Sequence, residues 1–327
     1  MTLKTRLESA ANSFHSIAKR VDETGAALRD YQSQPKELQG QFTDLVDRIF
    51  SWQGWGMHDS GRGSEDFKAL VGFLGPNGIL LDCVNKLQFD QFLTFPLIKQ
   101  ASGPDEKETT EQVDAFAYYF TRFAAFVTKT PLAHGRIAPE NHIYHELLAQ
   151  YLHYYLPLSG RFPHEIAPLS RHEANMSSPK SRSSARILRK DLHRSKSSDL
   201  SESMMLNRSG PSSVSRTHKL LEILGEWYLQ VKQQSCPLED QLRALRVTVK
   251  HLHSISGPSE TDQCAAVASF ILSEFYEPKM TRLITHCTEH WPVEVSFRLV
   301  LETFLSYVQP WRYRAGPDEV SSTNART

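Results

Sequence analysis

The residues that could do chemistry lie near the C-terminus, where the segment from His286 to His290 reads H-x-x-E-H. On a helix, His286 and His290 lie one turn apart on one face, as two zinc ligands do, and Glu289 could act as a base. However, Trp291-Pro292 ends such a helix at once, and the pattern supplies no third ligand. Because histidine is also favoured at helix C-termini by the helix dipole, we interpret His286, Glu289 and His290 as ordinary helix-end residues rather than a zinc site.

Two further histidine pairs have weaker spacing. The segment "NHIYHE" (141–146) places His142, His145 and Glu146 on adjacent helical turns. The segment "KHLHS" (250–254) has histidines two residues apart, so on a helix they point in opposite directions. Both pairs are therefore interpreted as solvated histidines or histidines at the edge of the core.

Motifs for nucleophilic or phosphate chemistry are missing from the sequence. It has no G-x-S-x-G, no Walker loop and no G-x-G-x-x-G, and "GPNG" (75–78) indicates a turn. Lys plus Arg and Asp plus Glu are equal at 37 each, which gives no electrostatic reason to expect nucleic acid as a partner. The residues alone assign no catalytic centre.

The elements that position these residues are predicted to be helices. Apolar residues recur at helical spacing through most of the chain, and alternating segments are nearly absent outside residues 92–99. We predict that residues 92–99 are extended or irregular, because Pro96 interrupts them. The first helix begins near Leu3 and should end at Thr24-Gly25, and "GPDEKETTEQ" (103–112) should be a polar loop. Tyrosines surround two aromatic-rich helices, which indicates that these helices lie deep in the protein or touch a second surface: Tyr118, Tyr119, Tyr151, Tyr154 and Tyr155.

The last predicted helix runs from Val293 to Val308 and ends at Pro310 and Trp311. Its inward face is expected to consist of the apolar residues Phe297, Val300, Leu301, Phe304 and Val308.

Composition divides the chain into four parts. Residues 161–217 are rich in Ser, Arg, Lys and Pro, and such a segment buries too little apolar surface to offset the cost of ordering its backbone. We therefore predict an all-α protein with helical blocks at 1–160 and 218–313, a disordered Ser/Arg-rich linker at 161–217 and a disordered tail at 314–327. Stacked helix pairs of solenoid type are compatible with this pattern.

The linker has three interpretations. It could be a solvated tether, a segment that contacts anionic lipid, or a regulatory segment that is phosphorylated on serines close to Arg194 and Arg208. The candidate serines are Ser195, Ser197, Ser198 and Ser209.

Cysteine usage and hydropathy point to a cytosol-facing chain. Four widely spaced cysteines without a CxxC pattern indicate buried, reduced thiols: Cys83, Cys236, Cys264 and Cys287. The first 20 residues lack the apolar region of a signal peptide, and we find no run of about 18 apolar residues that would span a bilayer.

A family resemblance adds to this reading. The segment "HWPVEVSFRLVLETFLSYVQPWRY" (290–313) closely resembles the sphingomyelin phosphodiesterase 4 family, also called neutral sphingomyelinase 3, and "KHLHS" precedes it as in that family. Looser similarity covers "PKELQGQFTDLVDRIFSW" (35–52), "FLGPNGILLDCVNKLQFDQFLTFP" (73–96) and "DAFAYYFTRFAAFVTKTPL" (114–132), in the family's order. The chain therefore resembles an N-terminal fragment of such a protein.

The resemblance implies a neutral, magnesium-dependent enzyme that hydrolyses sphingomyelin to ceramide and phosphocholine. It also implies a sphingomyelin-containing membrane of the endoplasmic reticulum or nuclear envelope as the site of action, on the cytosolic face, and nuclear pore components as partners. No catalytic residue can be carried over from the family, and the helical pattern does not match the β-sandwich of other neutral sphingomyelinases. The alternative that fits the residues is a non-catalytic helical scaffold that binds pore or envelope partners.

Overall fold

The protein is described by a computed structural model that covers residues 2–12, 16–31, 35–51, 54–55, 57, 62–89, 93–99, 109–129, 132, 142–160, 162, 212–231, 235–256 and 262–313. Two compact units make up the chain. One unit combines Met1–Pro163 with Ser213–Thr327, and the description below concerns this unit. The other unit, His164–Ser212, lies outside the described residues except for Ser212, and so does most of the predicted linker.

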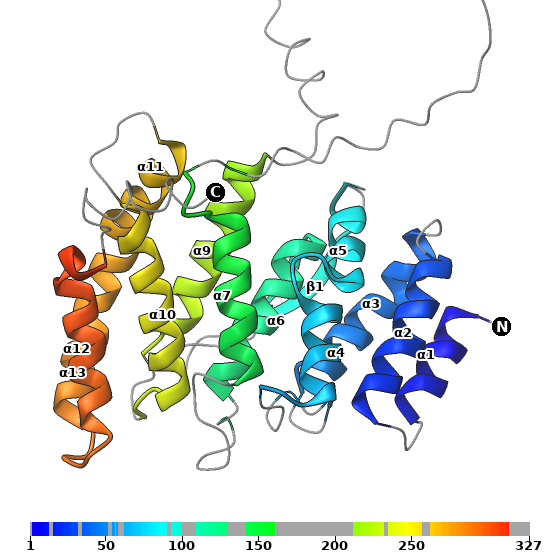
Figure 1. Cartoon of the computed structure of the whole chain (residues 1–327), viewed down its shortest axis with the longest axis horizontal. Helices are drawn as coiled ribbons and strands as arrows, with labels where there is room; N and C mark the ends of the chain where they lie inside the picture. The colour runs from blue at the N-terminus through cyan, green and yellow to red at the C-terminus, as the bar shows by residue number, and fades with distance from the viewer. Residues whose placement is uncertain are drawn as a thin grey trace, which may run out of the picture. The chain divides into compact units, whose positions relative to one another are not determined.

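Helices dominate the described residues, as the sequence predicted (Figure 1). The N-terminal part contains α1 (Leu3–Asn12), α2 (Ile17–Tyr31), α3 (Pro35–Ile49), α4 (Glu65–Leu74), α5 (Ile79–Phe89), α6 (Ala115–Lys129) and α7 (Ile143–Tyr155). The C-terminal part contains α9 (Ser213–Tyr228), α10 (Glu239–Ile255), α11 (Gln263–Phe270), α12 (Glu277–His290) and α13 (Phe297–Val308), with a π-helix η3 (Ile271–Tyr276) between α11 and α12 and a 3-10 turn η4 (Pro310–Arg312) after α13. Helix α9 begins within the stretch that composition assigned to the linker.

One small sheet interrupts the helical pattern. Strand β1 (Phe95–Lys99) pairs antiparallel with β2 (Thr109–Val113), with Phe95 opposite Val113. The extended prediction for residues 92–99 is confirmed for β1, but the predicted polar loop at 103–112 was wrong where β2 forms. The side chains of β2 are almost all exposed, so the strand carries no apolar alternation that could have revealed it.

The predicted end of the first helix at Gly25 was also wrong. The chain forms two helices, and α2 continues through Gly25 to Tyr31. Gly25 is buried, and a Cβ atom at this position would lie 3.7 Å from Ile79 and 3.9 Å from Phe73. The glycine therefore serves the close packing of α2 on α4 and α5, and does not end the helix.

Helix α6 lies at the centre of the unit and is buried along almost its whole length. It packs against α3, α5, α9, α10 and β1. The hydroxyl of its Tyr119 lies 2.7 Å from the hydroxyl of Tyr151 on α7, and Tyr151 donates to the Leu74 carbonyl oxygen at 2.6 Å. Of the two positions predicted for the aromatic helices, the deep one is confirmed.

The two helical blocks pack against each other within this unit. Helix α9 lies against α6, and α10 lies against α7 (Figure 1). Buried polar groups cross this boundary: the Thr217 hydroxyl donates to the Tyr155 carbonyl oxygen at 2.5 Å, and the Leu132 amide donates to Asp240 at 3.0 Å. Both blocks therefore share one core.

Helix α13 lies against α10 and α12, and its predicted inward face was wrong in large part. Val300 is fully buried and Phe297 is half-buried, but the three other predicted core residues are 37–47% exposed: Leu301, Phe304 and Val308. The inward side uses Thr303 and Ser306 instead. Apolar residues occupy more than one side of this helix, so periodicity could not identify the side that faces α10.

Candidate functional site

The H-x-x-E-H segment forms the last turn of α12, and Trp291 is its C-cap, as predicted. The rings of His286 and His290 are stacked, with centroids 4.4 Å apart and planes at 21°. His286 Nε2 lies 3.3 Å from the Ser235 carbonyl oxygen, and His290 Nδ1 lies 3.0 Å from the His286 carbonyl oxygen. Each ring thus has a backbone hydrogen bond.

This geometry does not suit a shared metal ion. A histidine nitrogen binds a metal in the plane of its ring, about 2.0–2.1 Å away. Two nearly parallel planes separated by a stacking distance cannot both contain one ion at that distance. In the part of the chain that the structure describes, no group of three or more His, Cys, Asp or Glu side chains could hold a metal ion.

The histidines of the two other pairs are buried in the protein. His142 caps α7 and accepts the Tyr144 amide on Nδ1 at 3.1 Å, and His145 is buried. His251 and His253 point to opposite sides of α10, as predicted. They join α10 to the carbonyl oxygens of Leu156, at 2.8 Å, and of Tyr307, at 3.0 Å.

His251 is held in its neutral form by its surroundings. Burial lowers the pKa of its imidazole to about 4, despite the opposing effect of the hydrogen bond to the Leu156 carbonyl oxygen. A carbonyl oxygen can only accept, so the Nε2 atom of His251 carries the proton. This histidine stabilises the contact between α7 and α10 and is poorly placed for proton transfer near neutral pH.

The cysteines are reduced, as predicted. Cys83, Cys264 and Cys287 are buried, Cys236 is half-buried, and all four are free. Burial raises the pKa of the Cys264 thiol to about 11 and that of the Cys287 thiol to about 12. Such thiols are weak nucleophiles near neutral pH.

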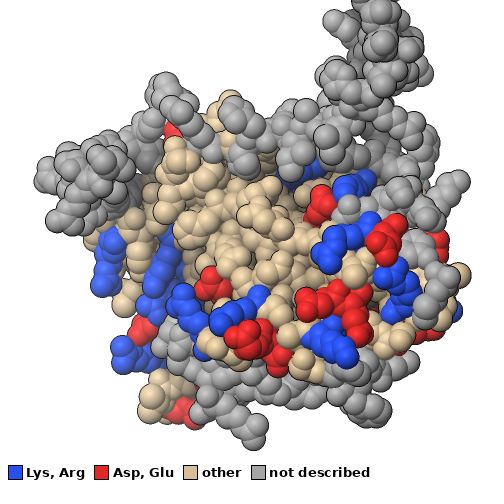
Figure 2. Space-filling model, turned by 45° about the vertical axis from the view of Figure 1, so that its right-hand side comes forward, with Lys and Arg blue, Asp and Glu red and all other residues tan. Residues whose placement is uncertain are grey.

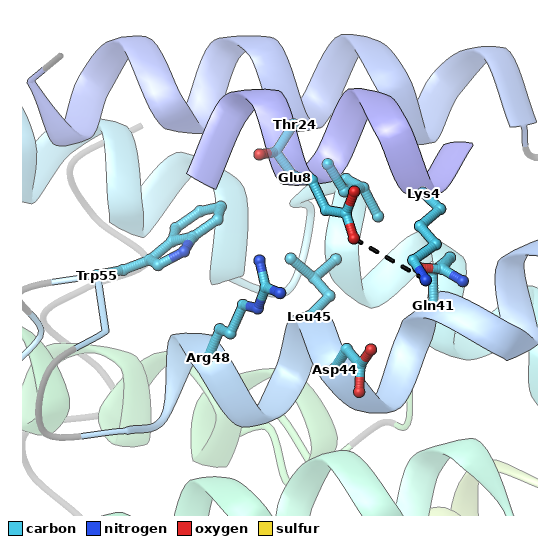
Figure 3. A pocket seen from close by; sticks show the side chains of 9 residues that line it. Lys4, Glu8, Thr24, Gln41, Asp44, Leu45, Arg48 and Trp55 are labelled. Carbon is cyan, nitrogen blue, oxygen red and sulfur yellow. Dashed lines mark ion pairs between the residues drawn. The ribbon is translucent and has the colours of Figure 1, made fainter. Parts of the chain in front are cut away.

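One pocket lies among α1, α2 and α3 (Figure 3). Lys4 and Glu8 from α1, at 4.0 Å from each other, lie at its edge, and Arg48 of α3 lies between Trp55 and Leu45. The cavity holds about 20 Å³, which is enough for one water molecule and too little for a lipid head group. This pocket is therefore a packing gap rather than a substrate site.

The second pocket is an open groove of about 710 Å³ between α10 and the start of α13. It is lined by charges of both signs and three uncharged residues: Glu239, Arg243, Arg246, Glu294, Arg298 and Glu302, with Val295, Ser296 and Leu299. We call this surface the α10–α13 groove. Three guanidinium groups and three carboxylates at one surface can contact both ends of a zwitterionic ligand.

Ion pairs set the geometry of this groove. Glu302 is bound by Arg298 at 2.7 Å and by Arg246, whose Nε also donates to the Ser306 hydroxyl at 3.1 Å. The hydrogen bond from Arg298, followed by the charge of Arg246, lowers the pKa of Glu302, so this carboxylate is ionised and unsuited to donate a proton. The i,i+4 spacing of Arg298 and Glu302 was readable from the sequence, but the contact with Arg246 across α10 was not.

One other face of the molecule carries mixed charges over part of its area. Figure 2 shows Lys and Arg side chains interspersed with Asp and Glu on the face over the N-terminal helices. This agrees with the equal totals of basic and acidic residues. Such a face gives no extended field of one sign.

By length and composition, one described stretch, Glu65–Gln88, could cross a membrane. In the structure it forms α4 and α5 with the predicted turn at 75–78 between them, and 56% of its most apolar 18-residue window is buried in the protein. Core helices of soluble proteins meet the same criterion, so the stretch is weak support for a membrane span.

The serines proposed for phosphorylation lie outside the described residues.

Comparison with known proteins gives one consistent result. The family described as mitochondrial-associated sphingomyelin phosphodiesterase matches residues 196–326, which include α9 to α13 and the α10–α13 groove. Four curated proteins match, all with the name sphingomyelin phosphodiesterase 4. The protein from Danio rerio is 36% identical over 97 residues, covering 26% of this chain and 12% of the relative.

Two other relatives agree with this. The Xenopus laevis protein is 36% identical over 89 residues (24% of this chain, 11% of the relative), and the Homo sapiens protein is 34% identical over 95 residues (25% and 11%). The matched part of the chain thus spans only about one eighth or one ninth of these relatives. No solved structure matches the chain significantly.

Proposed function

Because the chain belongs, through residues 196–326, to the family of mitochondrial-associated sphingomyelin phosphodiesterases, we propose that it serves the hydrolysis of sphingomyelin. The single observation that carries this proposal is the family match, together with four relatives that share one name. In this reaction water adds to the phosphorus atom, and the bond from phosphorus to the ceramide oxygen breaks. Phosphocholine and ceramide are the products, and the ceramide oxygen receives a proton.

We place the reaction at a membrane, since sphingomyelin is a bilayer lipid. The earlier resemblance supports a location on the cytosolic side of the endoplasmic reticulum and nuclear envelope, and activity at neutral pH with magnesium. These finer points rest on the resemblance, and the assay below tests the magnesium requirement.

Magnesium prefers oxygen ligands, usually one or two carboxylates together with water and substrate phosphate. The described residues gather no group of three His, Cys, Asp or Glu side chains that could hold a metal ion. Of the three carboxylates in the α10–α13 groove, Glu239 and Glu302 are engaged by arginines, and Glu294 accepts a hydrogen bond from the Ser296 hydroxyl. They do not fit a protein-built magnesium site. No step through a metal ion is therefore assigned to them, and the magnesium requirement stays a prediction.

Within the described residues, the α10–α13 groove is the surface that best suits the phosphocholine head group. The head group carries a phosphate, which guanidinium groups bind, and a quaternary ammonium, which carboxylates attract. The groove offers Arg246 and Arg298, which also bind Glu302, for the phosphate and Glu294 for the ammonium group, all within the matched region. The proposed role of these residues is to bind and orient the head group.

A second candidate function is a helical scaffold for nuclear pore or envelope partners. One observation favours it: Tyr151, His251 and His253 use their polar groups in hydrogen bonds to backbone carbonyl oxygens, and no metal-binding cluster forms among the described residues. Proximity labelling at nuclear envelopes tests this function. Failure to recover any pore or envelope protein would count against it.

The enzyme proposal is tested with purified protein and head-group-labelled sphingomyelin in mixed micelles, with magnesium or with EDTA. Release of phosphocholine above a heat-inactivated control is the expected result. Arg298→Ala should reduce sphingomyelin binding, whereas Arg6→Ala, which removes an exposed pair with Asp30 far from the groove in sequence, should not. Equal binding by both variants would remove the groove from the proposal.

A further inference from the structure

A group of basic side chains lies beyond the residues that line the α10–α13 groove, where η4 packs against α10. Lys250 follows Arg246 by one helical turn and therefore lies on the same face of α10. Its ammonium group is 5.5 Å from the centre of the Tyr313 ring, and Tyr313 directly follows Arg312, the last residue of η4. We call Arg246, Lys250, Arg312 and Tyr313 the Lys250 cluster.

Hydrogen bonds to one buried residue of α13 hold the frame of this cluster. The Tyr313 hydroxyl donates to Ser306 Oγ at 3.1 Å, and Arg246 Nε donates to the same oxygen at 3.1 Å. Ser306 is buried, so both side chains are tied to a fixed point. The ring against which Lys250 lies is thereby held in place.

Positive charge in the Lys250 cluster is only partly balanced. Glu302 is bound by Arg246 and also by Arg298, so this one carboxylate is shared between two guanidinium groups. Among the described residues, neither Lys250 nor Arg312 has an ion-pair partner, and Arg312 donates to the neutral side-chain oxygen of Gln309 at 3.1 Å. Arg246 and Lys250 repel each other at their i,i+4 spacing, although the whole chain has equal totals of basic and acidic residues.

The effect of this imbalance is seen on Lys250 itself. Burial lowers the pKa of its ammonium group, and the charge of Arg246 and, to a smaller extent, that of Arg312 lower it further. The opposing effects of Tyr313 and Glu302 offset only part of this change. The charged ammonium is thus less stable here than in water, and an anion bound beside it would favour it.

The side chains of the cluster indicate the kind of anion. Guanidinium and ammonium groups are the donors with which proteins bind phosphate. A phosphate monoester carries a charge of about −1.5 to −2 near neutral pH, whereas a phosphodiester carries a single charge. Several cations that share one carboxylate therefore suit a terminal phosphate better than the phosphodiester of a zwitterionic lipid.

We propose that the Lys250 cluster is a binding site for the phosphate group of a monoester. Lys250 and Arg312 are its principal ligands, and Arg246 is shared with the α10–α13 groove. A soluble phosphate and the head group of a lipid such as phosphatidic acid present this same group. The proposal does not depend on the proposed enzymatic function, because binding is measured without sphingomyelin.

Equilibrium dialysis of the full chain with labelled inorganic phosphate tests the soluble source, at low ionic strength because salt screens such contacts. We expect saturable binding at one site. Lys250→Gln and Arg312→Gln should each weaken it about tenfold, because each removes a charge-assisted hydrogen bond, whereas Lys250→Arg should retain most of it. The matched control is Lys68→Gln, which removes an exposed lysine of α4 that pairs with Glu65 at 2.8 Å and should leave binding unchanged.

Vesicle flotation tests the lipid source. Phosphatidylcholine vesicles carry either phosphatidic acid, whose head group is a phosphate monoester, or the same fraction of phosphatidylglycerol, which is a phosphodiester. Flotation with phosphatidic acid that Lys250→Gln removes would identify a lipid ligand. Binding of inorganic phosphate without such flotation would identify a soluble one.

The absence of both phosphate binding and flotation with phosphatidic acid would overturn the proposal. So would binding that Lys250→Gln and Arg312→Gln leave as strong as Lys68→Gln does, with all three variants folded by circular dichroism. Equal flotation with the two anionic lipids, without binding of inorganic phosphate, would likewise overturn it. The cations would then only complement the dipoles at the C-terminal ends of α10 and α13.

Discussion

Gly225 of α9 provides a substitution whose sign the packing decides. Alanine is normally a better helix former than glycine by about 1 kcal/mol, so Gly→Ala inside a helix should stabilise a protein. At Gly225, however, a Cβ atom would lie 2.6 Å from Phe275 Cε1 and 2.9 Å from Tyr276 Cε2. Both rings belong to the π-helix η3, which packs directly on α9.

Neither ring can move away without loss. Tyr276 is fully buried, and its hydroxyl donates to the Leu221 carbonyl oxygen at 3.2 Å. The ammonium group of Lys279 lies 3.4 Å from the centre of the Phe275 ring. Added methyl groups in packed cores cost about 1–3 kcal/mol, so after the propensity gain Gly225→Ala should destabilise the fold by up to roughly 2 kcal/mol.

Gly40 in α3 is the matched control, since nothing lies within 4 Å of a Cβ atom there and the residue is exposed. Gly40→Ala should raise the free energy of unfolding by up to about 1 kcal/mol. Urea unfolding followed by circular dichroism measures both variants. If Gly225→Ala stabilises the fold as Gly40→Ala does, the described packing of η3 on α9 is wrong.

Three further predictions concern buried polar groups and the histidine pair. Tyr228→Phe should lower the free energy of unfolding by about 1–3 kcal/mol, because the buried Tyr144 hydroxyl, 2.5 Å from that of Tyr228, then loses this partner. The double variant with Phe at positions 144 and 228 should lose less stability than the sum of the two single variants. The pKa of His251 in the folded protein is about 4, below its ordinary value of 6.5. Between pH 4 and pH 6.5 the unfolded chain therefore binds more protons than the folded chain does. The free energy of unfolding should fall as the pH decreases from about 6.5 to about 4. His251→Gln should flatten that slope in urea unfolding at several pH values, and an unchanged slope would assign the effect to other groups. Metal analysis of the purified chain should find no stoichiometric zinc, and zinc that is lost in His286→Ala would contradict the stacked geometry.

The sequence was most informative where a local rule decides structure. Helix periodicity predicted the all-α class, and Trp291-Pro292 predicted the end of α12. The rule failed at Gly25, because the close packing of α2 on α4 and α5 outweighs the helix-breaking tendency of glycine. It also failed for α13, whose inward side depends on hydrogen bonds to α10 and not on apolar periodicity.

The candidate site was harder to predict from the sequence than the helices were, because its geometry depends on tertiary contacts. The spacing of His286 and His290 was visible in the sequence, but the stacking of their rings was not. The α10–α13 groove joins residues that are 56 positions apart, such as Arg246 and Glu302, and single-sequence patterns do not report such pairings. The family resemblance came from one specific segment, residues 290–313, within the part that the comparison matched.

The most direct test of the proposed function is the release of labelled phosphocholine from sphingomyelin, measured for the purified chain beside the longer Danio rerio relative. We predict release above heat-inactivated controls that is lost when EDTA removes magnesium. No release from either protein above those controls would contradict the proposed sphingomyelin hydrolysis.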